Sequence, residues 1–215
     1  SNTYYNIMAA YSAAMAEPNF NIMNTQVLVP IKTRGMACTY ELNNAIQELV
    51  NPANRKKKEI TLFMGTGKPY ILREGDKIIN TSNNYRLDPV IYNGNIGVIR
   101  MIDSANEEII ADFVGIGEVS IPKEFWQGLE LGYSITVHKY QGSEADHVII
   151  GLDYSSYALL SRELVYTALT RAKTKCDLIV QTSALRYATA TEGVSKKQTH
   201  LPGILYEITH PKLVF

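Results

Sequence analysis

The stretch ITVHKYQGSEADHVII, residues 135–150, sets two apolar runs on either side of a short and strongly polar loop. The alternation that ends at His138 predicts one buried strand, and the run 148–150 predicts another directly after the loop. Because Gly142 lets the backbone approach a ligand closely, one interpretation is a binding loop at a strand end, where open α/β sheets gather their ligands. The other interpretation is a plain polar loop capped by Ser143 and Glu144.

The side chains of this loop suit a phosphorylated ligand. Alternate residues of a strand face opposite ways, so Thr136 and His138 share one face. Both could hydrogen-bond backbone phosphates, and Lys139 could add positive charge beside them. Glu144 could accept a hydrogen bond from a ribose hydroxyl. These four residues are therefore candidates for nucleic-acid and nucleotide contacts.

The sequence outside this loop shows two kinds of secondary-structure pattern. A β-prone run at 26–30 is followed by helical spacing of apolar residues from 40 to 50, and strands and a helix alternate again after residue 132. Between about 70 and 132, short β-rich runs separated by turn signals predict a small barrel. The predicted fold class is an α/β layer fold interrupted by a β-barrel insertion. The predicted boundaries are 1–69, 70–132 and 133–215.

A second segment with chemical character is SRELVYTALTRAKTKCDLIV, residues 161–180. Its apolar residues gather on one side of a predicted helix, and Arg171 stands at the seam between the apolar and polar sides. An arginine near a helix end, followed by a β-run, has the placement that an arginine finger needs to neutralise a transferring γ-phosphate. The alternative is an amphipathic helix whose arginine makes a local salt bridge.

Composition limits the classes of protein that remain. The formal net charge is zero, which excludes a bulk polycation but allows local basic patches. Cys38 and Cys176 do not have metal-ligand spacing, so no metal site is predicted and a reducing, cytoplasmic environment is expected. No apolar stretch is long enough to span a bilayer, so no membrane partner is expected.

The run Gly65-Thr66-Gly67-Lys68 resembles the end of a P-loop but does not fit one. The motif requires a glycine where Leu62 stands and a hydroxyl residue where Pro69 stands. Pro69 also disfavours the helix start that would direct amides at phosphate. A turn is predicted here, and the chain alone is not expected to hydrolyse ATP. Its first residues suggest an excised piece of a longer protein.

Four segments, taken in order, resemble superfamily 1 helicases. Residues 133–150 and 162–173 resemble motifs V and VI, and the HK-x-QGSE form is most similar to the RecD/Dda (1B) branch, as in the exodeoxyribonuclease V alpha subunit. Residues 26–52 are similar to motif IV and the helix after it. Residues 75–99 resemble the opening of the SH3-like 2B insertion. The resemblance implies a second RecA-like motor domain (2A) of the P-loop NTPase fold, interrupted by an SH3-like barrel (2B).

The resemblance also implies roles for individual residues. Residues expected to contact single-stranded DNA are Thr136, His138 and, in support, Lys139. Residues expected near the nucleotide are Gln141, Gly142 and Glu144, the last at the ribose. Arg171 is the expected γ-phosphate arginine, and Arg34, in the stretch after the motif IV strand, is a candidate for a second one.

Motifs I, Ia, II and III belong to the first RecA-like domain and are missing here. The resemblance implies that ATP and Mg²⁺ are bound mainly by that N-terminal domain, the expected partner of this chain besides single- or double-stranded DNA. The expected parent is a 5′–3′ DNA helicase, acting alone or with nuclease–helicase subunits of an exodeoxyribonuclease V complex. Two rivals are a binding module without motor role and half of a UvrD-like 1A helicase, against which the short SH3-like insertion argues.

Overall fold

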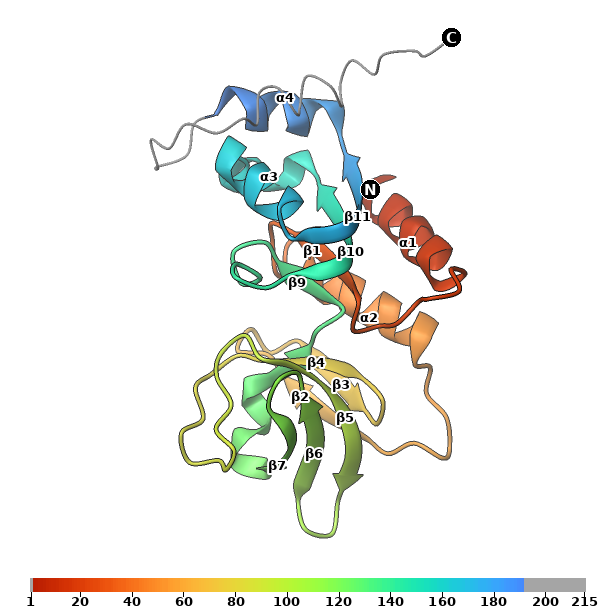
Figure 1. The fold of residues 1–215 in the computed structure, drawn as a ribbon, viewed down its shortest axis with the longest axis vertical. Coiled ribbons are helices and arrows are strands. Elements are labelled where there is room, and N and C mark those ends of the chain that lie inside the picture. The colour runs from red at the N-terminus through yellow and green to blue at the C-terminus, as the bar shows by residue number, and fades with distance from the viewer. Residues whose placement is uncertain (1, 192–215) are drawn as a thin grey trace. The chain divides into compact units, whose positions relative to one another are not determined.

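The computed structural model describes residues 2–191, and its chain divides into two compact units (Figure 1). The described residues of unit 1 are 2–18, 24–39 and 135–191. Unit 2 comprises Asn19–Met23 and Tyr40–Ser134. The C-terminal helical turns expected beyond residue 191 lie outside the described residues.

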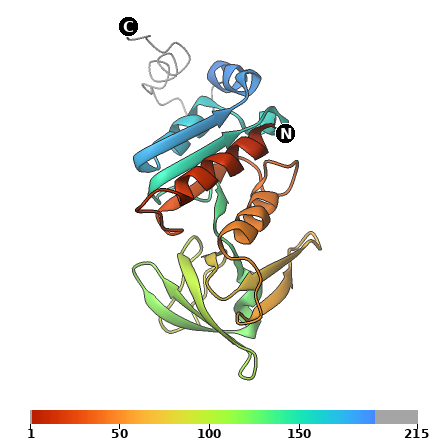
Figure 2. The same ribbon diagram turned by 90° about the vertical axis from the view of Figure 1, so that its right-hand side faces the viewer.

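Unit 1 is an α/β layer structure. Its described strands form a sheet in the order β11 (Ala172–Val180), β10 (Ala145–Leu152), β1 (Thr25–Val29) and β9 (Ser134–Thr136). β10 is parallel to both β1 and β11, and it is buried along almost its whole length. Its apolar run is explained by helices on both faces, because α1 (Asn2–Met15) and α3 (Arg162–Leu169) lie on opposite sides of the sheet (Figures 1 and 2).

Two further helical segments complete the described part of unit 1. The 3₁₀ segment η2 (Tyr154–Leu159) follows β10, and α4 (Thr182–Ala190) follows β11. Asp153 caps η2 by accepting a hydrogen bond from the Ser155 N–H. Ser161 caps α3 by accepting one from the Leu164 N–H at 3.2 Å. These caps fix where the chain leaves the sheet and returns to it.

Unit 2 contains the expected small barrel. Its described strands form an antiparallel sheet in the order β7-β6-β5-β4-β8. The bounds are β4 (Lys77–Asn80), β5 (Ile96–Asp103), β6 (Glu108–Phe113), β7 (Gly117–Pro122) and β8 (Leu129–Leu131). The 3₁₀ segment η1 (Lys123–Gly128) joins β7 to β8, and β2 (Glu59–Phe63) pairs with β3 (Pro69–Arg73) as a separate hairpin.

The helix α2 (Thr39–Val50) belongs to unit 2 from Tyr40 onward, so the expected boundary at residue 70 lies inside this unit. Two amide side chains, four residues apart on one face of α2, attach this helix to the rest of unit 2. Asn43 donates to the Ser134 carbonyl at 2.9 Å and accepts from the Ser134 N–H at 2.7 Å. Gln47 donates to the Ile71 carbonyl at 2.9 Å. These bonds satisfy backbone groups that burial would otherwise leave unpaired.

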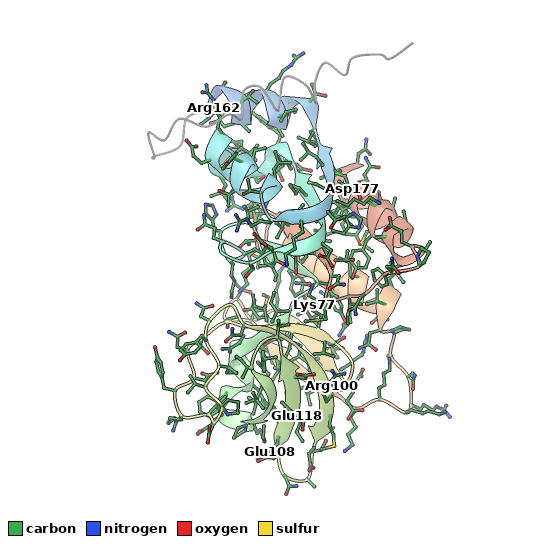
Figure 3. All side chains as sticks on the ribbon, viewed as in Figure 1. Lys77, Arg100, Glu108, Glu118, Arg162 and Asp177 are labelled. Atoms are coloured by element: carbon green, nitrogen blue, oxygen red, sulfur yellow. The ribbon has the colours of Figure 1, made fainter. Side chains whose placement is uncertain are left out.

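The interior of unit 2 holds two charged residues next to each other. Asp76 is fully buried and accepts hydrogen bonds from Gln47 at 2.6 Å, Asn51 at 2.7 Å and the Tyr133 hydroxyl at 2.9 Å. Its pKa is raised by burial, although these donors oppose the rise. Lys77, labelled in Figure 3, donates to the Ile22 carbonyl at 2.9 Å, and burial lowers its pKa to about 7.

Candidate functional site

The polar loop after β9 is held in a series of tight turns. It begins beside the last residue of β1, where the Val137 N–H donates to the Val29 carbonyl at 3.1 Å. The Tyr140 N–H then donates to the Thr136 carbonyl at 3.1 Å, and the Gln141 N–H donates to the His138 carbonyl at 3.3 Å. The loop is therefore held in a defined conformation by its own backbone hydrogen bonds. The bond from Gln141 to His138 connects the part predicted to contact the nucleotide, after Tyr140, with the part predicted to contact DNA, before it.

Burial divides the loop into an anchor and a surface. Tyr140 is buried, and this burial raises its pKa to about 12. His138, Gln141 and Glu144 are exposed, and Gly142 has φ +85° with open space where a Cβ would stand. Glycine is required there by the left-handed backbone and not by crowding. The sequence did not single out Tyr140, although a large side chain amid polar ones was the available signal.

Arg171 lies against the end of this loop. Its guanidinium donates to the Ser143 carbonyl at 3.3 Å and to the Thr167 carbonyl at 3.1 Å. Its own carbonyl accepts from the Ala145 N–H at 3.0 Å, and Ala145 pairs with Ala172 where β10 and β11 begin. β11 thus begins directly after Arg171, because strand pairing takes over as soon as the helix ends. The structure brings Arg171 into contact with Ser143, in the loop that also contains Gln141, Gly142 and Glu144.

Lys173 is a charged neighbour of Glu144 that was not predicted from the sequence. Lys173 Nζ lies 3.9 Å from a Glu144 carboxylate oxygen, and both side chains are more than half exposed. Exposed pairs of this kind contribute at most about 1 kcal/mol to stability. The pair therefore leaves the Glu144 carboxylate accessible to a ligand, with a lysine beside it.

Arg34 lies elsewhere in unit 1. A Cβ built on its neighbour Gly35 would meet the Ser155 hydroxyl at 3.5 Å, beyond the carboxyl end of β10. Arg171 stands at the amino end of that strand, so at about 3.3 Å per residue the strand separates the two ends by roughly 20 Å. The structure does not bring Arg34 to Arg171, and its role as a second γ-phosphate arginine stays a prediction.

The P-loop-like run is the turn of the β2–β3 hairpin. The Gly67 N–H donates to the Met64 carbonyl at 2.8 Å, and the Met64 N–H donates to the Lys68 carbonyl at 2.8 Å. A strand follows, where a phosphate cradle would require a helix.

Within unit 1, Arg171 and Glu144 offer a cation and an acceptor that fit a triphosphate and a ribose. Their contacts with a nucleotide stay a prediction.

Trp126 and His147 have structural roles. Trp126 is buried and its indole N–H donates to the Ile121 carbonyl at 2.9 Å. His147 is buried and lies 2.7 Å from an Asp177 carboxylate oxygen. Among residues 2–191, no cluster of three or more His, Cys, Asp or Glu side chains could hold a metal ion. Over the same residues, no helix has both the length and the apolar character to cross a membrane.

Comparison with known proteins assigns both units. Residues 131–179 match the model of the UvrD-like helicase C-terminal domain, and residues 42–113 match that of the ATP-dependent RecD-like DNA helicase SH3 domain. The chain belongs to the RecD-like helicases. The RecD-like SH3 match begins within α2, as does the long segment of unit 2, Tyr40–Ser134. The expected RecA-like fold with an SH3-like barrel is confirmed.

Individual relatives agree with this family. The chain is 34% identical over 180 residues to the ATP-dependent RecD2 DNA helicase of Deinococcus radiodurans, covering 83% of this chain and 23% of the relative. It is 32% identical over 120 residues to the RecBCD enzyme subunit RecD of Mycobacterium tuberculosis, covering 56% and 20%. The chain thus spans less than a quarter of either relative.

Solved structures support the fold. A Pif1 helicase from Bacteroides, in complex with ADP-AlF3 and ssDNA, matches with a TM-score of 0.54 at 15% identity. The match covers 97% of this chain and 52% of that one. At this identity the likeness concerns the fold alone.

Proposed function

We propose that this chain is the C-terminal motor half of an ATP-dependent DNA helicase or translocase of the RecD-like family. The observation that supports the proposal most is the contact between the Arg171 guanidinium and the Ser143 carbonyl. It joins a cation suited to a γ-phosphate to a loop whose other side chains suit ribose and DNA. A relative named as an ATP-dependent DNA helicase supports the same activity.

In this proposal the nucleotide lies between Arg171 and a separate N-terminal RecA-like domain. ATP with Mg²⁺ supplies the phosphoryl group that is transferred to water. Arg171 stabilises negative charge on that group, and Glu144 accepts a hydrogen bond from the ribose. Gln141 and Gly142 line the same side with exposed polar and backbone groups. The chain alone is inactive because half of the site belongs to the other domain.

The contacts with DNA are assigned to the first part of the loop that follows β9. Thr136 and His138 contact the phosphates of a single strand, and Lys139 adds charge beside them. Since the Gln141 N–H bonds to the His138 carbonyl, movement of the nucleotide side is passed to the DNA side through the backbone. Translocation in the 5′–3′ direction is part of this proposal. A relative is named as the RecD subunit of the RecBCD enzyme, which supports the further proposal that the parent protein acts with nuclease–helicase subunits.

The test is ATP turnover by the full-length protein that contains this chain. Changing Arg171→Ala should lower kcat for ATP by roughly a thousandfold or more, since it removes charge stabilisation of the transition state. Single-strand affinity should change by less than about threefold. Arg186→Ala, at an exposed arginine on α4, is the matched control and should leave both values unchanged. Normal turnover in the Arg171 variant would refute the assignment.

A further inference from the structure

The segment between β4 and β5, residues 81–95, is a long loop in the barrel of unit 2. Loops of about 12–15 residues without regular structure are uncommon in compact domains and usually have a function. This one belongs to unit 2, whereas the loop and the arginine already described belong to unit 1. Most of its sequence lies within the stretch 75–99 that resembles the opening of the SH3-like insertion.

Buried asparagines hold this loop in place. Asn80 is fully buried and its amide donates to the Tyr92 carbonyl at 2.9 Å. Asn84 is 6% exposed, donates to the Asn80 side-chain oxygen at 3.3 Å, and bonds through its backbone N–H to the Ile91 carbonyl at 2.9 Å. Leu87 and Ile91 are buried beneath the loop. The loop is therefore fixed from within by polar and apolar contacts together.

The same arrangement leaves two tyrosines exposed. Tyr85 is 69% exposed and Tyr92 is 50% exposed, and their rings meet edge to face with centroids 6.2 Å apart. Asn83 sets their positions, because its amide donates to the Tyr85 hydroxyl at 3.3 Å and its oxygen accepts from the Asn93 N–H at 2.9 Å. Aromatic rings held rigidly at a surface lose little conformational entropy when they bind a partner.

The local charge indicates which partner fits. The nearest cation in the loop, Arg86, lies over the Phe125 ring at 4.9 Å and pairs with Glu124 at 3.2 Å. Both side chains of this pair are more than half exposed, so Arg86 stays accessible to a phosphate, but one cation does not make a basic patch for the phosphates of a duplex. Single-strand binders combine positive charge along the sugar-phosphate backbone with aromatic rings on which bases stack, and this loop offers an exposed arginine, Arg86, together with two exposed rings. The combination favours a single strand, whose bases are available for stacking.

We propose that Tyr85 and Tyr92 form a base-stacking platform for single-stranded DNA on the barrel. This inference rests on the proposed motor function and adds a contact made through bases, whereas Thr136 and His138 are assigned to phosphates. The platform lets the barrel hold a strand independently of its sequence, because every base has an aromatic face.

The experiment measures binding of fluorescent oligothymidylate to the full-length protein by anisotropy. Tyr85→Ala and Tyr92→Ala should each weaken binding by about fivefold or more, the effect expected for one lost stacking contact. Tyr85→Phe should bind as the wild type, because it keeps the ring. Tyr5→Ala, at an exposed tyrosine of α1, is the matched control and should have no effect.

A second strand separates stacking from a structural role. On an oligonucleotide with the same sugar-phosphate backbone but abasic sites, wild type and Tyr85→Ala should bind equally well. If the alanine variant binds oligothymidylate like the wild type, or loses the same factor on both strands, the platform is overturned and the motor proposal stands. If the wild type binds neither strand and hydrolyses no ATP, the motor proposal itself has failed.

Discussion

Two loops of this chain contain similar polar residues but use them in opposite ways. In the loop of unit 1, residues 137–144, the backbone makes the turns and polar side chains such as His138 and Glu144 are exposed. In the loop of unit 2, residues 81–95, the amide of Asn84 is buried against that of Asn80 in the preceding strand β4, and the rings of Tyr85 and Tyr92 are exposed.

The difference teaches that burial, and not residue type, decides what a polar side chain does. An exposed carboxylate or imidazole keeps its hydrogen-bonding capacity for a ligand. A buried amide uses that capacity to satisfy the backbone, and its removal leaves unpaired groups behind. Changes in the barrel should therefore affect folding first, and changes in the unit 1 loop should affect ligands first.

The largest effect on stability is expected at Lys77, whose pKa burial lowers to about 7. Its unfolded pKa is near 10.4, so between about pH 7 and 10 the unfolded chain binds more protons than the folded one. The free energy of unfolding should consequently rise with pH across this window, by several kcal/mol in total. Lys77→Met should flatten this rise, which urea unfolding at a series of pH values would reveal.

The matched control for that measurement is Lys56→Met, at an exposed lysine of the same unit. It should leave the slope between pH 7 and 10 unchanged. Above about pH 10 the rise ends, because Lys77 is then neutral in both the folded and the unfolded chain. Stability falls beyond this point, because burial raises the pKa of Tyr70 and keeps its hydroxyl protonated only in the folded chain. An equally steep rise in the Lys77 variant would show that another group is responsible.

An intermediate effect is expected at Asn84. Asn84→Ala removes the amide that bonds to Asn80 and should lower the free energy of unfolding by about 1–3 kcal/mol, the cost of leaving buried polar groups unpaired. Asn83→Ala, at the exposed neighbour in the same loop, should cost less than about 1 kcal/mol. Chemical denaturation of both variants provides the measurement. Equal losses would mean that burial does not distinguish the two asparagines.

The sequence predicted the alternation of strands and helices and the small barrel because both follow from local apolar patterns. It also predicted the proximity of Arg171 to the loop, although only through the family resemblance. It did not predict that α2 joins the barrel, since that depends on Asn43 and Gln47, which apolar periodicity ignores. The position of Arg34 depends on sheet register between segments more than a hundred residues apart, which no local pattern contains.

The smallest effect on stability, and the clearest contrast with Asn84, is expected at Glu144. Its partner Lys173 is 3.9 Å away and both side chains are more than half exposed, so Glu144→Gln should change the free energy of unfolding by less than about 0.5 kcal/mol. In the full-length protein the same change should raise KM for ATP several-fold, because an amide oxygen accepts more weakly from a ribose hydroxyl than a carboxylate does. Lys173→Ala removes the same ion pair and is the control: it should match Glu144→Gln in stability but leave KM nearly unchanged. If both variants raise KM equally, the ion pair acts on the nucleotide as a unit, and the carboxylate has no separate contact with the ribose.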